Sequence, residues 1–253
     1  MPASLELEDY VSAIAQSGAV LRDAAERAGF ERRVPTCPDW TVADLVAHQG
    51  MVHRWAAANL RGDPDHDTER SQAEGAAAPD PLAWFSAGLD ALLDTLRTVP
   101  DDVDAPVFLK DAPRPRLFWA RRQAHETTIH SVDALSAAVG GLLPSADTSI
   151  APELAADGID ELLRGFLPRK KSRLRSPEPR VILVRCHDTG HEWSLHVSGD
   201  PVVTATGAAD APDAVFTGTA LQLYLDLWNR ADEAAVDGRP ELSEQWRAQA
   251  RIV

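Results

Sequence analysis

Three side chains in this sequence, His48, Glu126 and His130, have the types and the spacing that metal chemistry requires. Glu126 and His130 lie four positions apart in RRQAHETTIHSVDA, so in a helix both leave the same face one turn apart. His48 lies in DLVAHQGMVHRW, among apolar residues that would turn it toward the interior of a helical bundle. We therefore expect two helices to supply one metal site.

This ligand set indicates catalysis rather than a purely structural metal. Two imidazoles and one carboxylate leave a coordination position open for a water, a thiolate or a substrate oxygen. Zinc is the first choice, although nickel, cobalt and iron accept the same ligands. Spacing alone also fits a bland interpretation, in which His48 is a hydrogen-bonded core residue and Glu126 and His130 form a simple surface pair.

Other histidines are less suitable as ligands. His53 follows His48 by five positions and so points about 140° away around a helix. His125 precedes the candidate carboxylate directly and faces another side. The segment HEWSLH, residues 191–196, repeats the spelling of HETTIH, residues 125–130. In the strand predicted there, its glutamate and second histidine would lie roughly 13 Å apart, too far to share one ion.

The first half of the chain must position these residues, and its pattern is helical. Apolar residues recur at spacings of three and four, and alanine and leucine dominate. A capping-box-like pair, Thr41 and Asp44, marks one helix start, with Trp40 before it as a hydrophobic staple. The polar segment 61–81 reads as a long surface loop. The helices are expected near residues 4–28, 41–61, 80–98 and 117–139.

The second half has a different texture. A Gly/Pro/Ser hinge at residues 140–149 separates it from the first half. A further helix, short β-type runs and a return to helical spacing predict an α+β domain with an antiparallel sheet. We expect domains at residues 1–145 and 146–253. The helix is expected near 151–166, the strands near 181–186, 191–197, 201–206 and 214–218, and the final helical segments at 219–233 and 242–252.

Bulk properties exclude several classes of function. The formal charge of −14 over 253 residues disfavours nucleic acid and anionic membrane surfaces as partners. The basic run at residues 169–175 is a local exception, best interpreted as a solvated loop. No targeting or membrane-spanning segment is apparent, so we expect a cytoplasmic protein. Cys37 and Cys186 are too few and too far apart for a disulfide framework, and we expect both to be reduced.

Two segments taken together resemble a known family. VPTCPDWTVADLVAHQGMVHRWA and WARRQAHETTIHSVDA are similar to the mycothiol-dependent maleylpyruvate isomerases of actinobacteria, a branch of the DinB-like metal-binding four-helix bundles. The resemblance extends over nearly the whole chain, because that family also carries a C-terminal α+β domain resembling sterol-carrier-protein folds. It implies an N-terminal DinB-like four-helix bundle followed by a smaller α+β domain.

The same resemblance implies a function and a set of roles. His48, Glu126 and His130 would hold zinc, and mycothiol would bind at the open position. The thiolate would then add to a small electrophilic or acidic substrate, as an isomerase or an S-transferase does. Arg230, in LYLDLWNRADE, matches the arginine that holds the substrate carboxylate in that family. Arg122 and Asp133 are candidates to support the ligands from the same helix.

Two features leave the substrate open. Ser131 follows His130 where relatives commonly have arginine, and the polar segment 61–81 is long. Two other classes of function also stay open. One is a non-catalytic, metal-containing binding or regulatory protein, and the other is a metal-dependent hydrolase without a thiol cofactor.

Overall fold

The computed structural model describes residues 5–63, 65–110 and 112–250. The chain divides into two compact units, each described by itself below. The first comprises Glu6–Val107 and Ala112–Leu143, and the second consists mainly of the chain from Pro144 onward. The predicted fold class, a helical bundle followed by an α+β unit with a small sheet, is confirmed.

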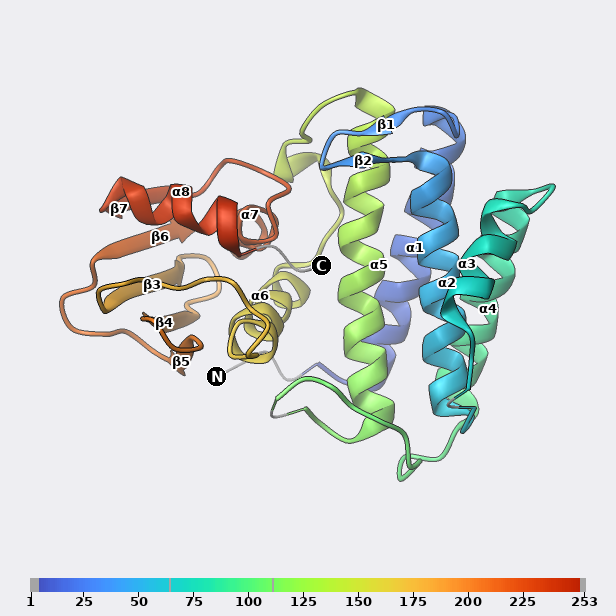
Figure 1. Cartoon of the computed structure of the whole chain (residues 1–253), viewed down its shortest axis with the longest axis horizontal. Helices are drawn as coiled ribbons and strands as arrows, with labels where there is room; N and C mark the ends of the chain where they lie inside the picture. Colours follow the sequence, from blue (N-terminus) through green and yellow to red (C-terminus); the bar gives the residue numbers. More distant parts are fainter. Residues whose placement is uncertain (1–4, 64, 111, 251–253) are drawn as a thin grey trace. The chain divides into compact units, whose positions relative to one another are not determined.

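Four long helices build the first unit. In Figure 1, α1 runs along α5, and α2 runs along α4. The buried residues of α1, α2 and α4 are mostly alanine, leucine and valine, as the apolar spacing predicted, whereas more than half of those of α5 are polar. The helices are α1 (Leu7–Ala28), α2 (Val42–Leu60), α4 (Pro81–Thr98) and α5 (Pro115–Val139).

A short hairpin that the sequence analysis did not predict leads into α2. It pairs β1 (Arg33–Val34) with β2 (Cys37–Thr41) in antiparallel fashion. The predicted capping box is confirmed at its end: the Thr41 hydroxyl accepts from the Asp44 amide at 3.3 Å, and the Asp44 carboxylate accepts from the Thr41 amide at 2.8 Å. Thr41 therefore ends the hairpin and caps α2 at the same time.

The polar segment between α2 and α4 is not one long loop, and that prediction was wrong. It contains a helix, α3 (Thr68–Ala76). The buried residues of α3 are Ser71 and Gly75, one turn apart, so its inner face carries no apolar period that sequence reasoning could detect. Gly75 permits close packing, because a Cβ there would lie only 2.6 Å from the Trp84 ring.

The second unit contains a five-stranded sheet in the order β5-β4-β3-β6-β7. Its neighbouring strands pair antiparallel except for β3 and β6, which pair parallel. The expected strands are all present, whereas the edge strand β7 was missed because its four residues are exposed and carry no alternating pattern. The strands are β3 (Arg180–Cys186), β4 (Glu192–Val197), β5 (Val203–Thr206), β6 (Ala214–Gly218) and β7 (Ala235–Gly238).

Two indole groups tie helices into this unit. Trp193 of β4 donates its Nε1–H to Asp160 at 3.0 Å, and Trp246 donates to the Leu227 carbonyl at 3.0 Å. Both rings are fully buried, so these bonds satisfy polar atoms that would otherwise lack partners. The helices are α6 (Pro152–Asp160), continued by a π-helical turn at Glu161–Phe166, then α7 (Ala220–Leu227) and α8 (Pro240–Gln249), with a 3-10 turn at Ser145–Asp147.

Parts of three sequence expectations reach beyond the described residues. The expected first helix began at residue 4, the expected last helical segment ended at residue 252, and the polar segment includes residue 64. Among the residues that are described, no helix combines the length and the hydropathy that a bilayer span requires.

A polar cluster lies inside the first unit. His53 Nε2 lies 2.8 Å from the Gln49 side-chain nitrogen and 2.9 Å from the Thr127 hydroxyl, and all three side chains are fully buried. Burial lowers the pKa of His53 to about 3, because the charged imidazolium would lose its hydration there. The ring is therefore neutral in the folded protein at all but strongly acidic pH.

This burial predicts a specific dependence of stability on pH. Between about pH 3 and pH 6.5 the unfolded chain binds a proton at His53 that the folded chain does not, so His53 makes the protein less stable as pH falls through this window. The substitution His53→Gln should abolish this difference in bound protons, which is at most one. The slope of the unfolding free energy against pH should therefore fall by up to about 1.4 kcal/mol per pH unit. Urea unfolding of the wild type and of His53→Gln between pH 5 and 7 measures the two slopes. Equal slopes would contradict the assignment.

Candidate metal centre

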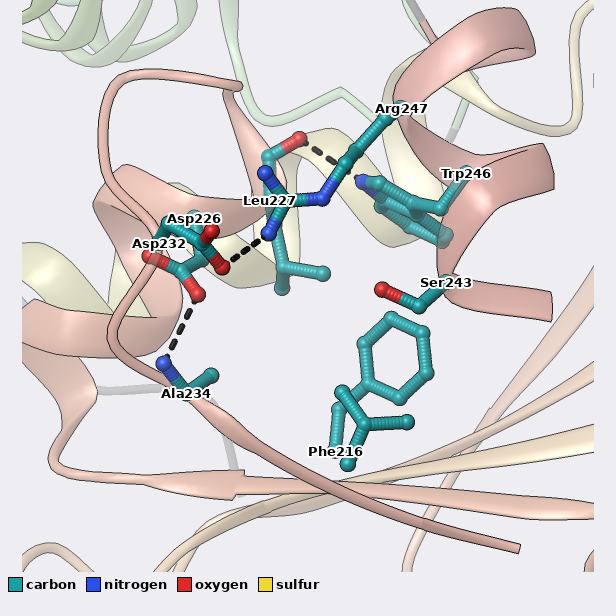
Figure 2. Close-up of a pocket in the computed structure, with 9 residues that line it drawn as sticks. Phe216, Asp226, Leu227, Asp232, Ala234, Ser243, Trp246 and Arg247 are labelled. Atoms are coloured by element: carbon teal, nitrogen blue, oxygen red, sulfur yellow. Dashed lines mark hydrogen bonds and ion pairs between the residues drawn. The ribbon is translucent and has the colours of Figure 1, made fainter. Parts of the chain in front are cut away.

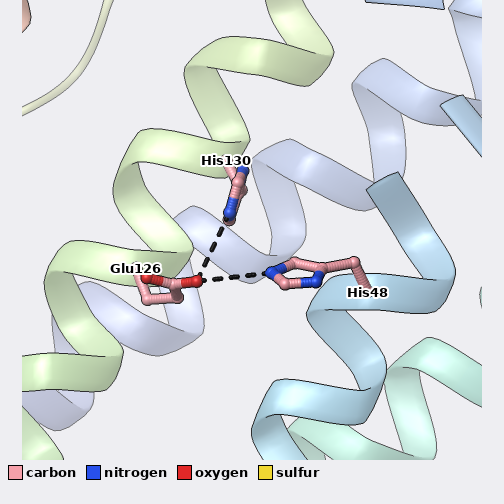
Figure 3. A group of neighbouring side chains, drawn as sticks. All are labelled: His48, Glu126 and His130. Carbon is pink, nitrogen blue, oxygen red and sulfur yellow. Dashed lines mark ion pairs between the residues drawn. The ribbon is translucent and has the colours of Figure 1, made fainter. Parts of the chain in front are cut away.

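Helices α2 and α5 bring the three predicted side chains together. His48 Nε2 lies 3.5 Å from Glu126 Oε1, and His130 Nε2 lies 3.4 Å from the same oxygen. Figure 3 shows both imidazoles directed at this carboxylate from two helices. In the described part of the chain, this is the one group of three or more histidine, cysteine or acidic residues whose ligand atoms converge, within 4.8 Å of one another.

The distances fit a shared divalent ion. Ligand atoms bonded at roughly 2.0–2.1 Å to a tetrahedral zinc lie about 3.3 Å apart, which is close to the distance from Glu126 Oε1 to each imidazole nitrogen. Each imidazole presents Nε2, and the carboxylate presents a single oxygen. Two nitrogen donors and one oxygen donor suit zinc and similar ions and leave the fourth position for another ligand.

Solvent reaches the three residues unequally. The side chains of His48 and Glu126 are 22% and 23% exposed, whereas that of His130 is 10% exposed. The centre is therefore sheltered, while parts of His48 and Glu126 stay open to solvent. A site of this kind can exchange a ligand without dismantling the bundle.

Arg122 holds the far oxygen of the carboxylate. Its Nη2 donates to Glu126 Oε2 at 2.8 Å, and the arginine is nearly fully buried. Burial by itself would raise the pKa of Glu126, but hydrogen bonds to His130 and His48 and the charge of Arg122 together hold that pKa well below its usual range. Glu126 is thus ionised, with one oxygen held by Arg122 and the other facing the histidines.

Asp133 supports His130 by a hydrogen bond, as Arg122 supports Glu126. Its Oδ2 lies 2.9 Å from His130 Nδ1, and the carboxylate is fully buried. Burial would lower the pKa of His130, but the hydrogen bonds to Asp133 and Glu126 outweigh it and raise the pKa to about 9. Asp133 also accepts from the Thr36 hydroxyl at 2.5 Å and from the Cys37 thiol at 3.6 Å.

Trp40 covers the two imidazoles from the hairpin. Its ring centroid lies 4.8 Å from that of His48 and 5.8 Å from that of His130. Sequence reasoning treated Trp40 as a helix staple and gave Thr36 no role. Both residues lie in VPTCPDWT, close in sequence to a helix that carries a candidate ligand, but this closeness did not reveal which way the side chains point.

The histidines judged unsuitable do lie elsewhere. His53 belongs to the buried cluster with Gln49 and Thr127. His125 is fully buried and meets the Tyr10 ring edge-on, with the ring centroids 6.4 Å apart. The glutamate of HEWSLH lies in β4 and pairs with Arg185 at 2.6 Å. Cys37 and Cys186, both within the described residues, are not joined in a disulfide.

Arg230 lies in the second unit, just beyond the end of α7. Its guanidinium donates to the Trp228 carbonyl at 2.7 Å, and the side chain is half-buried. Its expected role toward a substrate carboxylate stays a prediction.

A small hollow in the second unit offers an alternative site, but its polar groups serve the fold. Figure 2 shows it between α7, α8 and the sheet, with Phe216 and Trp246 on its apolar side. Arg247 pairs with Asp232, and the Asp226 carboxylate accepts from the backbone amides of residues 233 and 234. This hollow shows no converging set of reactive groups.

Comparison with known proteins gives a consistent result. Residues 11–135 match the model of the mycothiol maleylpyruvate isomerase N-terminal domain, and residues 153–245 match that of the corresponding C-terminal domain. No curated protein matches the sequence. Two crystal structures of mycothiol-dependent maleylpyruvate isomerase, one of them a mutant, share the fold with a TM-score of 0.62. Their identity to this chain is 13–14%, over 92% of this chain and 93% of theirs.

The two domain matches together cover most of the sequence and both structural units. The converging histidines and carboxylate fall within the first matched region, and the five-stranded sheet falls within the second. The chain therefore belongs to the mycothiol maleylpyruvate isomerase family.

Proposed function

We propose that this chain is a divalent-metal-dependent enzyme that uses mycothiol as its thiol cofactor. It would act as an isomerase or an S-transferase on a small electrophilic or acidic substrate. The observation that carries the proposal is the convergence of His48, Glu126 and His130 on one point, where His48 and Glu126 are partly open to solvent. Family membership favours mycothiol over other low-molecular-weight thiols.

The chain's own residues divide the work at this site. His48, Glu126 and His130 would hold the ion, with zinc the first choice. Arg122 and Asp133 keep the carboxylate ionised and the imidazole oriented. Trp40 shields the rings from water on its side. When bound, the ion would lower the pKa of a coordinated thiol, so that the nucleophilic thiolate forms near neutral pH.

Arg230 is the proposed contact for a substrate carboxylate, since a guanidinium can grip two oxygens at once. Ser131 cannot supply such a charge: it is buried, and its hydroxyl donates to the Thr128 carbonyl of its own helix at 2.7 Å. An acidic substrate therefore has fewer cationic contacts here than a chain with arginine at that position would offer. The charge of −14 supports a small molecule rather than nucleic acid as the partner, and we propose a cytoplasmic location.

Metal content gives the first test of the proposed function. Protein purified without chelators should hold a stoichiometric divalent ion, and His48→Ala and Glu126→Ala should each lose most of it, because two remaining ligands bind weakly. Elemental analysis with chelator competition measures both. His53→Gln is the matched control, since it alters a histidine of the same helix whose ring bonds Gln49 and Thr127 rather than a candidate ligand, and it should leave the metal in place. A metal-free wild type, or full metal content in His48→Ala, would overturn the site.

The second prediction concerns the thiol. Zinc-loaded protein should bind mycothiol in calorimetry with release of a proton, detected as a dependence of the heat on buffer ionisation enthalpy. The metal-free protein and Glu126→Ala should not bind it. Turnover of maleylpyruvate, or of an electrophilic thiol acceptor, should then require both metal and thiol. If the metal-loaded protein binds no mycothiol, the thiol part fails and a metal-dependent hydrolase becomes the better explanation.

The third prediction tests the proposed substrate-binding role of Arg230 independently of metal binding. Arg230→Lys keeps the charge but loses the bidentate grip, so the KM for a carboxylate substrate should rise roughly tenfold. Metal content and mycothiol affinity should stay at the wild-type level. An unchanged KM would remove Arg230 from the site, whereas lost metal would show that the change damaged the fold instead.

A further inference from the structure

We propose that Thr36, in the turn of the β1–β2 hairpin, is a positioning residue for the metal centre. It acts through Asp133, whose carboxylate fixes the orientation and the tautomer of His130. This inference rests on the proposed function, because it assigns a task to residues around the same ion. It adds a segment far from α5 in sequence to the machinery that prepares the ligands.

The contacts of Asp133 distinguish its two oxygens. Oδ1 accepts from the Thr36 hydroxyl at 2.5 Å, while Oδ2 lies 2.9 Å from His130 Nδ1 and accepts from the Cys37 thiol at 3.6 Å. The carboxylate is fully buried, where an ionised group needs such donors to offset its lost hydration. With both oxygens held, the carboxylate cannot rotate, and Oδ2 stays aimed at the imidazole.

The orientation of His130 follows from this. A carboxylate accepts hydrogen bonds, so Nδ1 of His130 carries the proton that it donates to Asp133. The other ring nitrogen, Nε2, then points at Glu126 Oε1 from 3.4 Å. This arrangement suits a metal-binding histidine. An acceptor holds the protonated Nδ1, and the unprotonated Nε2 is directed at the ion.

The pairing within the hairpin helps to hold Thr36 in place. The pairing of Val34 with Cys37 makes Thr36 part of the connecting turn, and the Val34 side chain is fully buried as an anchor. At its other end the hairpin continues into the capping box of α2, the helix of His48. Trp40, from β2, contacts both imidazoles. One short segment therefore meets the centre at the supporting carboxylate and at the ligand rings.

A comparable hydrogen bond elsewhere in the bundle serves as a control. Ser17 of α1 and Thr128 of α5 share a hydrogen bond of 2.9 Å, which also links distant segments through hydroxyl groups. It joins α1 to α5, and none of the three candidate ligands takes part in it. Its loss should affect stability and leave the metal centre alone.

The test compares zinc affinity across variants, measured by competition with a chromophoric chelator. Thr36→Val removes the hydroxyl while keeping the shape and should weaken zinc binding roughly tenfold or more, the range typical of support residues behind a ligand. Thr36→Ser should restore binding. Ser17→Ala should bind zinc as the wild type does, even where its melting temperature falls as far as that of Thr36→Val. The visible absorption of the cobalt-substituted protein should change for Thr36→Val alone among these variants.

A double-mutant cycle with Asp133→Asn separates an indirect effect from a general one. If Thr36 acts through Asp133, the loss of zinc affinity in the double variant should be smaller than the sum of the single losses in free energy. Additive losses, or wild-type affinity and cobalt absorption in Thr36→Val, would overturn the inference while leaving the proposed function standing. A wild-type protein that binds no zinc would instead mean that the proposed function itself has failed. Should Thr36→Val not fold, Thr36→Ala in the same cycle decides.

Discussion

The pitch of α5 is the constraint on which the candidate centre depends. Arg122, Glu126, His130 and Asp133 follow one another at intervals of four, four and three residues, so a single helical face carries two ligands and both groups that support them. Each member contacts the next: the arginine binds the carboxylate, the carboxylate faces the histidine, and the histidine binds the aspartate. Only His48 and the hairpin must be brought to this face by tertiary packing.

Burial makes this row of charges dependent on its pairing. An isolated carboxylate inside a bundle would be costly, yet Glu126 and Asp133 each have a cationic or hydrogen-bonding neighbour at both oxygens. The same pairing pulls the pKa of Glu126 down and that of His130 up, so it favours the charged form of each. Burying these charged groups therefore costs the bundle stability relative to an all-apolar core.

Sequence reasoning found what is encoded locally and missed what is decided by distant contacts. The four long helices and the three converging side chains follow from apolar period, capping residues and the four-residue spacing within α5. The β1–β2 hairpin could not be predicted, because its short strands contain Pro38 and have no alternating pattern. Helix α3 was hidden by small residues on its buried face, and Asp133 could be suspected but not linked to Thr36, 97 positions away.

Because two candidate ligands and their two supporting residues share one uninterrupted helix, α5 should tolerate insertions and deletions less well than substitutions. Each residue advances an α-helix by about 100°, so one inserted or deleted residue between Arg122 and Asp133 would swing part of the row out of line by that angle. Conservative exchanges would only retune single contacts. Natural variation along this stretch should therefore consist of substitutions, with insertions and deletions confined to the connections outside α5.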